Sequence, residues 1–101
     1  MLSKVVKVKP GHTRQTLNYS DSLMMCEIHI DRGVVVEKHS HHSEQMGYVV
    51  RGKALMMVDG ESKIYEEGQS YFVPSQSEHS AEGIEDTIVI DVFCPPRDEF
   101  K

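Results

Sequence analysis

Turn-forming residues recur along this chain at intervals too short to leave room for helices. Glycine, proline and aspartate gather repeatedly, from Pro10-Gly11 to Glu85-Asp86, and short runs rich in Val, Ile, Tyr, Phe and Met lie between them. Short apolar runs bounded by turns are typical of β-strands. Many such strands in succession predict an all-β fold, either a sandwich or an antiparallel barrel. The expected strands are Lys4–Lys9, Leu23–Ile30, Val34–Val36, Gly47–Val50, Ala54–Val58, Ser62–Tyr65, Tyr71–Val73 and Thr87–Phe93.

Two local patterns support this interpretation. In Leu23–Ile30 apolar and polar residues alternate with a period of two, which favours a strand with one wet face over a helix. Asp59-Gly60 lies between two strand-like runs, and both residues tolerate the positive φ that a two-residue hairpin turn requires. The polar residues 97–101 are expected to fray. Since no linker or repeat interrupts the chain, residues 1–101 are expected to form a single domain.

The charge balance excludes several classes of partner. Eleven Lys and Arg against sixteen Asp and Glu leave a net charge of −5. A nucleic acid or an anionic membrane surface would need a basic patch, so we expect neither. Apolar runs such as Ala54–Val58 are too short to span a bilayer, and Met1–Val5 lacks the apolar core of a signal peptide. We therefore expect a cytoplasmic protein with Cys26 and Cys94 as reduced thiols.

Six histidines are many for 101 residues, and three of them fall within four positions. Residues two apart in a strand share one face, with Cα atoms about 6.5 Å apart, so His39 and His41 could converge on one metal ion. His42 would then point to the opposite face, while His79 could reach the same ion from a distant strand. The alternative is a polar loop with exposed histidines, and residue types alone leave both interpretations open.

Two motifs with fixed spacing surround these histidines and resemble the signatures of the cupin superfamily. The first is Gly33-x5-His39-x-His41-x3-Gln45-x6-Gly52, where cupins have Gly, His, His, Glu and Gly at the same spacing. The second is Gly68-x5-Pro74-x-Gln76-x2-His79, where cupins have Gly, Pro, Gly and His, followed by an Asn at the position of Gly83. Fifteen residues separate the motifs, which is similar to the gap in small microbial cupins. The resemblance implies an antiparallel double-stranded β-helix, or jelly-roll barrel, with one metal ion in its cavity.

The resemblance also implies a set of metal ligands, namely His39, His41, Gln45 and His79. Gln45 stands where cupins carry glutamate, although a small register shift would let Glu44 take its place. Three imidazoles and an amide add no formal charge. A divalent ion would therefore bind less tightly than it does with three imidazoles and a glutamate, and it would polarise a substrate oxygen more strongly. This donor set favours Lewis-acid chemistry over oxygen activation, and it suits Zn, Ni, Mn, Fe or Co.

A second group of chemistry-bearing residues lies near the C-terminus. Alternation places Asp91 on one face of the last strand and the apolar Ile88, Ile90 and Val92 on the other, which we expect to pack between the sheets. An unpaired buried aspartate is costly, so Asp91 faces either solvent or a functional cavity. Pro95-Pro96 end the strand and would hold Arg97 at a defined position near the barrel mouth.

This tail resembles that of the KdgF-like cupins of pectin and alginate degradation, which also carry glutamine in the glutamate position. The resemblance implies an enzyme that converts 4,5-unsaturated uronates, small anionic products of polysaccharide lyases, to the linear 4-deoxy-5-keto form. Asp91 would move protons, Arg97 would bind the carboxylate with two parallel hydrogen bonds, and Phe93 would lie against the sugar ring. The alternatives are a dioxygenase or isomerase acting on another small molecule, and a non-catalytic sugar- or metal-binding module.

The remaining candidates are expected to have structural roles. His12 and His29 have no partner at ligand spacing, so we expect them to be exposed or to cap a turn. Tyr48 and Tyr71 are expected to pack in the barrel, and the open edge of Lys4–Lys9 is expected to pair two copies into a homodimer. The core is expected to contain Cys26 as a small hydrophobe and the methionines Met24, Met25, Met46, Met56 and Met57.

Overall fold

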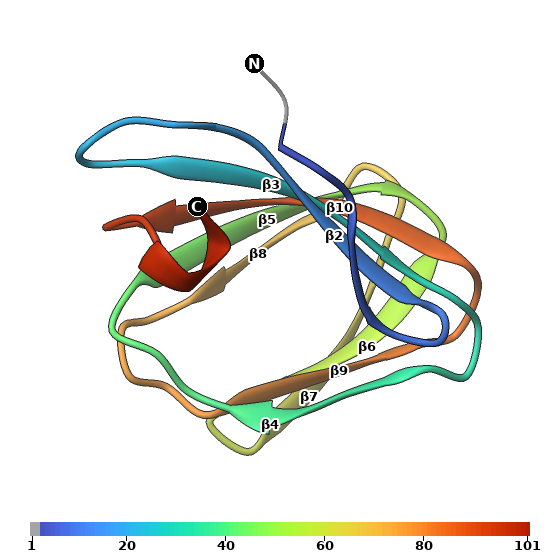
Figure 1. Ribbon diagram of the computed structural model, residues 1–101. Coiled ribbons are helices and arrows are strands. Elements are labelled where there is room, and N and C mark those ends of the chain that lie inside the picture. The colour runs from blue at the N-terminus through green and yellow to red at the C-terminus, as the bar shows by residue number, and fades with distance from the viewer. Residues whose placement is uncertain (1–2) are drawn as a thin grey trace.

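Residues 3–101, the part of the chain that the computed structural model describes, form ten strands and one short 3-10 helix (Figure 1). The strands are β1 (Val6–Lys9), β2 (His12–Tyr19), β3 (Met24–Ile30), β4 (Val35–His39), β5 (Glu44–Arg51), β6 (Lys53–Val58), β7 (Glu61–Glu66), β8 (Ser70–Val73), β9 (His79–Gly83) and β10 (Thr87–Cys94), and the helix η1 spans Asp98–Phe100.

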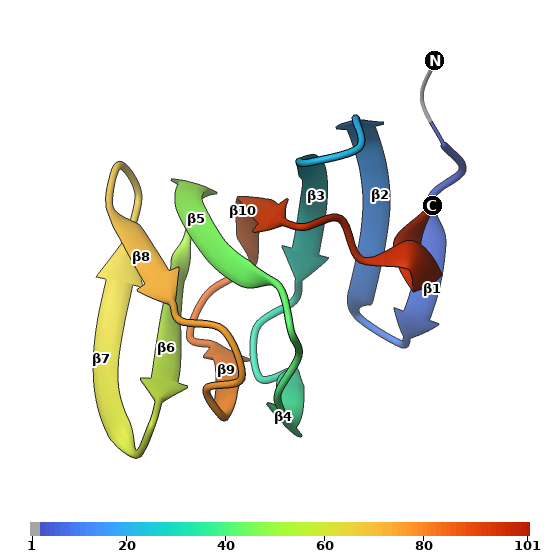
Figure 2. The same ribbon diagram turned by 90° about the vertical axis from the view of Figure 1, so that its left-hand side faces the viewer.

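The strands form two antiparallel sheets that face each other. One sheet has six strands in the order β1-β2-β3-β10-β5-β8, and the other has four in the order β4-β9-β6-β7. Figure 1 views the six-stranded sheet above the four-stranded one, and Figure 2 shows the same layers turned by 90°. Because β5 lies in one sheet and β6 in the other, the chain passes repeatedly between layers, as in a jelly-roll barrel.

The local patterns in the sequence locate most of these strands. The alternating segment Leu23–Ile30 forms β3, and the Asp59-Gly60 turn joins β6 to β7 with φ angles of 50° and 83°. Two strands are absent from the prediction. β2 reads HTRQTLNY and β9 reads HSAEG, and neither contains the apolar alternation on which strand prediction depends. Within the described residues, no helix is long and apolar enough to cross a membrane.

The prediction for the two faces of β10 is wrong. Thr87, Asp91 and Phe93 are buried on the inner face, whereas Ile88 and Val92 are only half-buried on the outer one. The reason is that β10 lies between β3 and β5 in the six-stranded sheet, so its aliphatic side chains sit among apolar neighbours outside the barrel. Val92, for example, is paired with Met25 on β3 and Met46 on β5.

Several side chains also differ from expectation. Tyr48, Met25 and Met46 are exposed because they lie on the same outer face, while Met24 and Met56 are buried as expected. His12, expected at the surface, is 9% exposed, because alternation along β2 turns it inward. The buried apolar residues fall into two clusters, one of Val49, Met56, Tyr71, Val73 and Val89 and one of Met24, Cys26 and Phe93.

The C-terminal residues do not fray. The helix η1 folds back over the barrel, and the Phe100 ring stacks edge-on against Phe93 with 5.8 Å between ring centroids. The hydroxyl of Thr16 donates a hydrogen bond to the carbonyl oxygen of Phe100 across 2.5 Å. These contacts tie the tail to β2 and β10, which the polar composition of residues 97–101 does not predict.

Candidate metal centre and cavity

Three histidines from two segments converge between the sheets. His39 ends β4 and is paired in register with His79, which begins β9, and His41 follows in the loop before β5. The ring centroids of His39 and His79 are 4.2 Å apart, and those of His41 and His79 are 4.8 Å apart. One ring nitrogen from each histidine lies within 4.8 Å of the other two. The triad can therefore hold a metal ion.

Each of these rings is fixed by the same kind of hydrogen bond. The Nδ1 atoms of His39, His41 and His79 lie 2.8 Å from the carbonyl oxygens of the residues at positions 37, 43 and 77. A carbonyl oxygen only accepts, so each Nδ1 carries the proton and each Nε2 of the neutral ring presents a lone pair. Nε2 of His79 is buried without a hydrogen-bond partner. This buried, unpaired acceptor is what a metal ligand without its ion presents.

Burial also keeps two of the rings neutral. Desolvation lowers the pKa of His79 to about 4, with smaller contributions from the other two histidines and from Arg97. Desolvation likewise lowers the pKa of His41, and the charge of Arg97 lowers it further. Since the neutral imidazole is the form that binds metals, both rings are in the ligating form at neutral pH.

Gln45 faces the triad, and Glu44 does not. Gln45 is 6% exposed on the inner face of β5, whereas Glu44 is exposed on the outer face. Oε1 of Gln45 lies 3.1 Å from Nε2 of His41, and the side chain of Gln45 is also close enough to Asp91 to lower the pKa of that carboxyl group. Because Nδ1 of His41 carries the proton, Oε1 of Gln45 and Nε2 of His41 are two acceptors facing each other. Two ligands about 2.1 Å from one ion and at right angles are about 3 Å apart, so this pair fits a cation.

Asp91 faces the interior and not solvent. It is 3% exposed, and its Oδ1 accepts a hydrogen bond from the Tyr71 hydroxyl across 2.5 Å. Desolvation raises the pKa of Asp91 to about 6, although the hydrogen bonds from Tyr71 and Gln45 and the charge of Arg97 oppose that shift. The carboxyl group is thus poised to exchange a proton near neutral pH.

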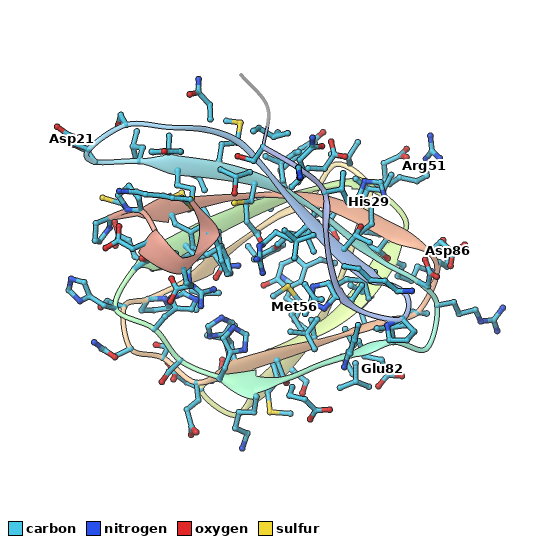
Figure 3. The ribbon with its side chains drawn as sticks, in the orientation of Figure 1. Asp21, His29, Arg51, Met56, Glu82 and Asp86 are labelled. Atoms are coloured by element: carbon cyan, nitrogen blue, oxygen red, sulfur yellow. The ribbon has the colours of Figure 1, made fainter. Side chains whose placement is uncertain are left out.

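A cavity of about 210 Å³ lies next to the triad and Asp91. Its wall includes Phe93 and Arg97, and the Arg97 guanidinium lies 5.5 Å from the centre of the Phe93 ring. Met56 points into this interior in Figure 3, whereas Asp21, Arg51 and Asp86 lie at the periphery. The volume is below the range of about 300–1,000 Å³ typical of drug-sized ligands, so the cavity suits a compound the size of a monosaccharide.

The other histidines stay outside the triad. His42 is exposed on the loop after β4, and His29 is half-exposed, with its Nε2 2.7 Å from a carboxylate oxygen of Glu27. Neither Cys26 nor Cys94 forms a disulfide in the described part of the chain.

The backbone favours glycine at both positions where the second motif departs from the cupin pattern, and Gly83 supplies it whereas Gln76 does not. Gln76 has φ = 67°, in the left-handed region that favours glycine, and its backbone N–H donates to the carbonyl oxygen of His41 across 2.8 Å. Gly83 leaves no room for a side chain, because a Cβ there would lie 2.5 Å from the carbonyl oxygen of Asp31.

Four charged, imidazole or aromatic side chains that line the cavity are absent from the sequence-based set of site residues. They are His12 and Arg14 on β2, Tyr71 on β8, and Phe100 in η1. One signal could have located Tyr71. Gly47 lies in the middle of a strand, which indicates a close approach of another group, and a Cβ there would lie 2.2 Å from the Tyr71 hydroxyl.

The comparisons with known proteins agree with this geometry. A family model described as a cupin domain matches residues 26–93. The chain belongs to the cupin family. It is 30% identical over 92 residues to the pectin degradation protein KdgF of Dickeya dadantii (strain 3937), covering 89% of this chain and 84% of that protein.

Two solved structures are also similar to this chain over nearly its whole length. KdgF from Halomonas sp. superposes with a TM-score of 0.92 at 33% identity, over 98% of this chain and 92% of that one. An RmlC-like cupin from Shewanella frigidimarina also has a TM-score of 0.92, at 34% identity, over 98% of this chain and 89% of the other. Salicylate 1,2-dioxygenase from Pseudoaminobacter salicylatoxidans, at 17% identity, shares the fold alone.

Proposed function

We propose that this protein is a metal-dependent enzyme that converts 4,5-unsaturated uronates to their linear 4-deoxy-5-keto form. The observation that carries the proposal is that Asp91 and Arg97 line the same cavity as His39, Gln45 and His79. A non-catalytic module would not need an acid with a perturbed pKa facing the ligand. The similarity to a pectin degradation protein over most of both chains supports this substrate class.

The ion would be held by His39, His41 and His79, with Oε1 of Gln45 as the fourth ligand. A divalent Zn, Ni, Mn, Fe or Co ion suits these donors and would supply Lewis acidity to substrate oxygens. Gln45 would lie between the ion and Asp91, because its Oε1 faces His41 and its side chain lowers the pKa of that carboxyl group.

The reaction needs a proton donor, a proton acceptor and side chains that bind the sugar. Water adds across the C4–C5 double bond, so that C4 gains a proton and C5 gains a hydroxyl group. The hemiketal opens as the bond from C5 to the ring oxygen breaks, which leaves a ketone at C5 and a hydrated aldehyde at C1. Asp91 has a pKa of about 6, so it can give a proton to C4 and take one from the attacking water, and the proton of the new hydroxyl group passes to the ring oxygen as the C5–O bond breaks. Arg97 binds the carboxylate, and Phe93 lies against the ring.

The direct test follows the ultraviolet absorbance of the enol ether in an unsaturated uronate prepared with a polysaccharide lyase. Protein loaded with each divalent metal in turn should accelerate its loss, and the chelated protein should not. Asp91→Asn should lower the rate at least tenfold, while the exposed Glu44→Gln should leave it unchanged. Absence of acceleration with every metal would disprove the proposed reaction.

We also propose that the chain forms a homodimer in the cytoplasm. β1 is the terminal strand of the six-stranded sheet, and Val6 and Val8 on it are 43% and 44% exposed. Free edge strands with apolar side chains tend to pair with another chain. Light scattering should give twice the chain mass, and a Val6→Lys, Val8→Lys double variant should give the mass of one chain. A single-chain mass for the unaltered protein would contradict pairing.

A further inference from the structure

The inner face of β2 is polar where a barrel wall is normally apolar. Alternation turns His12, Arg14 and Thr16 inward, and His12 and Thr16 are 9% and 4% exposed. Arg14 is half-buried and lines the cavity beside Arg97. An arginine directed into a barrel is rare unless it is paired. The described residues contain no ion pair for Arg14.

Arg14 meets Arg97 at the ring of Phe100. The guanidinium carbon of Arg14 lies 3.7 Å from the ring centre, and that of Arg97 lies 4.1 Å from it. Two hydrogen bonds fix the position of Phe100. The Thr16 hydroxyl donates to its carbonyl oxygen, and its backbone N–H donates to the carbonyl oxygen of Arg97 across 2.9 Å. Two planar cations from opposite ends of the chain are therefore stacked on one fixed ring.

The positive charge at this end of the cavity is poorly balanced. Glu99, whose side chain is 64% exposed, is the one acid within 4 Å of Arg97 among the described residues, at 3.5 Å. That contact is not aligned as a hydrogen bond, since Nε of Arg97 is buried without a partner. Asp91, the buried acid, accepts a hydrogen bond from Tyr71 and forms no ion pair with either arginine among the described residues. Two guanidinium groups with unused donors select an anion.

We propose that Arg14 shares the carboxylate of the substrate with Arg97, and that this pair of arginines makes the cavity select an acidic sugar over a neutral one. The substrate class rests on the proposed function, but the two-arginine site rests on the contacts at Phe100. Arg14 is a binding residue for the acid group and takes no part in moving protons. Lysine would keep the charge but lose the planar, two-donor geometry.

Titration calorimetry with metal-loaded protein tests the two-arginine site, because it measures binding affinity in the absence of turnover. The probes are a saturated uronate, galacturonate, and its neutral methyl ester, each titrated at low salt. Arg14→Gln should weaken galacturonate binding at least tenfold and leave methyl ester binding within twofold, and Arg14→Lys should lie between. Arg51→Gln, on the exposed outer face of β5 (Figure 3), is the matched control and should change neither value.

Arg14→Met is a second variant for the case in which Arg14→Gln fails to fold, because methionine keeps an apolar contact with Phe100. It should lose the same preference for the acid over the ester. Equal binding of acid and ester by the unaltered protein, or an unchanged preference in the folded Arg14 variants, would overturn the two-arginine site. Failure of the unsaturated uronate assay would instead disprove the proposed reaction, because galacturonate binding does not depend on it.

Discussion

The hydroxyl group of Tyr71 on β8 donates a hydrogen bond to Oδ1 of Asp91 on β10 across 2.5 Å, inside the barrel. Both strands belong to the six-stranded sheet. Gly47 makes this contact possible, because a Cβ at that position would lie 2.2 Å from the hydroxyl oxygen and 2.4 Å from Oδ1 of Asp91. β5, which carries Gly47, lies between the strands that carry the other two residues. The missing side chain is thus what allows an acid to be buried and still hydrogen-bonded.

Removing the Tyr71 hydroxyl group should make the free energy of unfolding more dependent on pH. The folded protein holds the Asp91 proton more tightly than the unfolded chain, since the pKa of Asp91 is raised from 3.8 to about 6. Folding stability from this group therefore falls as pH rises from about 4 to about 6. Tyr71→Phe removes a hydrogen bond to the carboxylate, so it should raise that pKa further and cost about 1–3 kcal/mol at pH 8, and less at pH 4. Urea unfolding at the two pH values measures this difference.

The exposed Tyr48 offers a matched control, because Tyr48→Phe removes the same atom from the outer face of the sheet. It should change stability by less than about 0.5 kcal/mol at either pH. An equal loss of stability for Tyr71→Phe at pH 4 and pH 8 would mean that the hydrogen bond does not act on the Asp91 carboxylate.

Removal of a ligand histidine should remove the metal. In the proposed site three imidazoles share the ion, so His39→Ala and His79→Ala should each reduce bound metal from about one ion per chain to well below 0.2, as measured by elemental analysis after dialysis. His42→Ala alters the exposed neighbour in the same loop and should retain the full complement. Full metal content in either ligand variant would exclude that histidine from the site.

A carboxylate at position 45 should separate metal affinity from catalysis. Gln45→Glu adds a negative ligand, so affinity for a divalent ion should rise about tenfold or more. The same change places a second carboxylate near Asp91 in place of the amide that lowers the pKa of Asp91, so turnover of the unsaturated uronate should fall. Competition with a chelating dye gives the affinity. Glu44→Gln, on the opposite face of β5, should leave both quantities unchanged, and an unchanged affinity in Gln45→Glu would argue against ligation by this residue.

Position 76 should tolerate glycine better than its own residue. Gln76 has φ = 67°, which costs a side chain about 1–2 kcal/mol relative to ordinary backbone. Part of the gain is offset by the greater freedom of glycine in the unfolded chain. Gln76→Gly should therefore stabilise the protein by about 0.5–1 kcal/mol and raise Tm by a few degrees, whereas Gln76→Ala should be nearly neutral. A lower Tm for the glycine variant would contradict the strain.

The strands that obey local rules can be predicted from the sequence alone. The period-two alternation of residues 24–30 and the Asp59-Gly60 turn depend on neighbouring residues only, so they are readable without a fold. The cupin resemblance of the two motifs likewise implies that His39, His41 and His79 lie together, and the structure brings the three rings together. Gln45 and Asp91 are candidates on the same resemblance, and alternation along the last strand leaves Asp91 facing either solvent or a cavity.

Which face of each strand turns inward depends on contacts between distant parts of the chain. The inner face of β10 carries Asp91 while its aliphatic residues lie outside, and β2 turns Arg14 into the barrel. Both invert the rule that polar residues face water, and they can do so because partners from distant strands supply the hydrogen bonds and the stacking that burial requires. Tyr71 on β8 and Phe100 after β10 are such partners. Their roles depend on contacts between residues far apart in the chain, which no local pattern records.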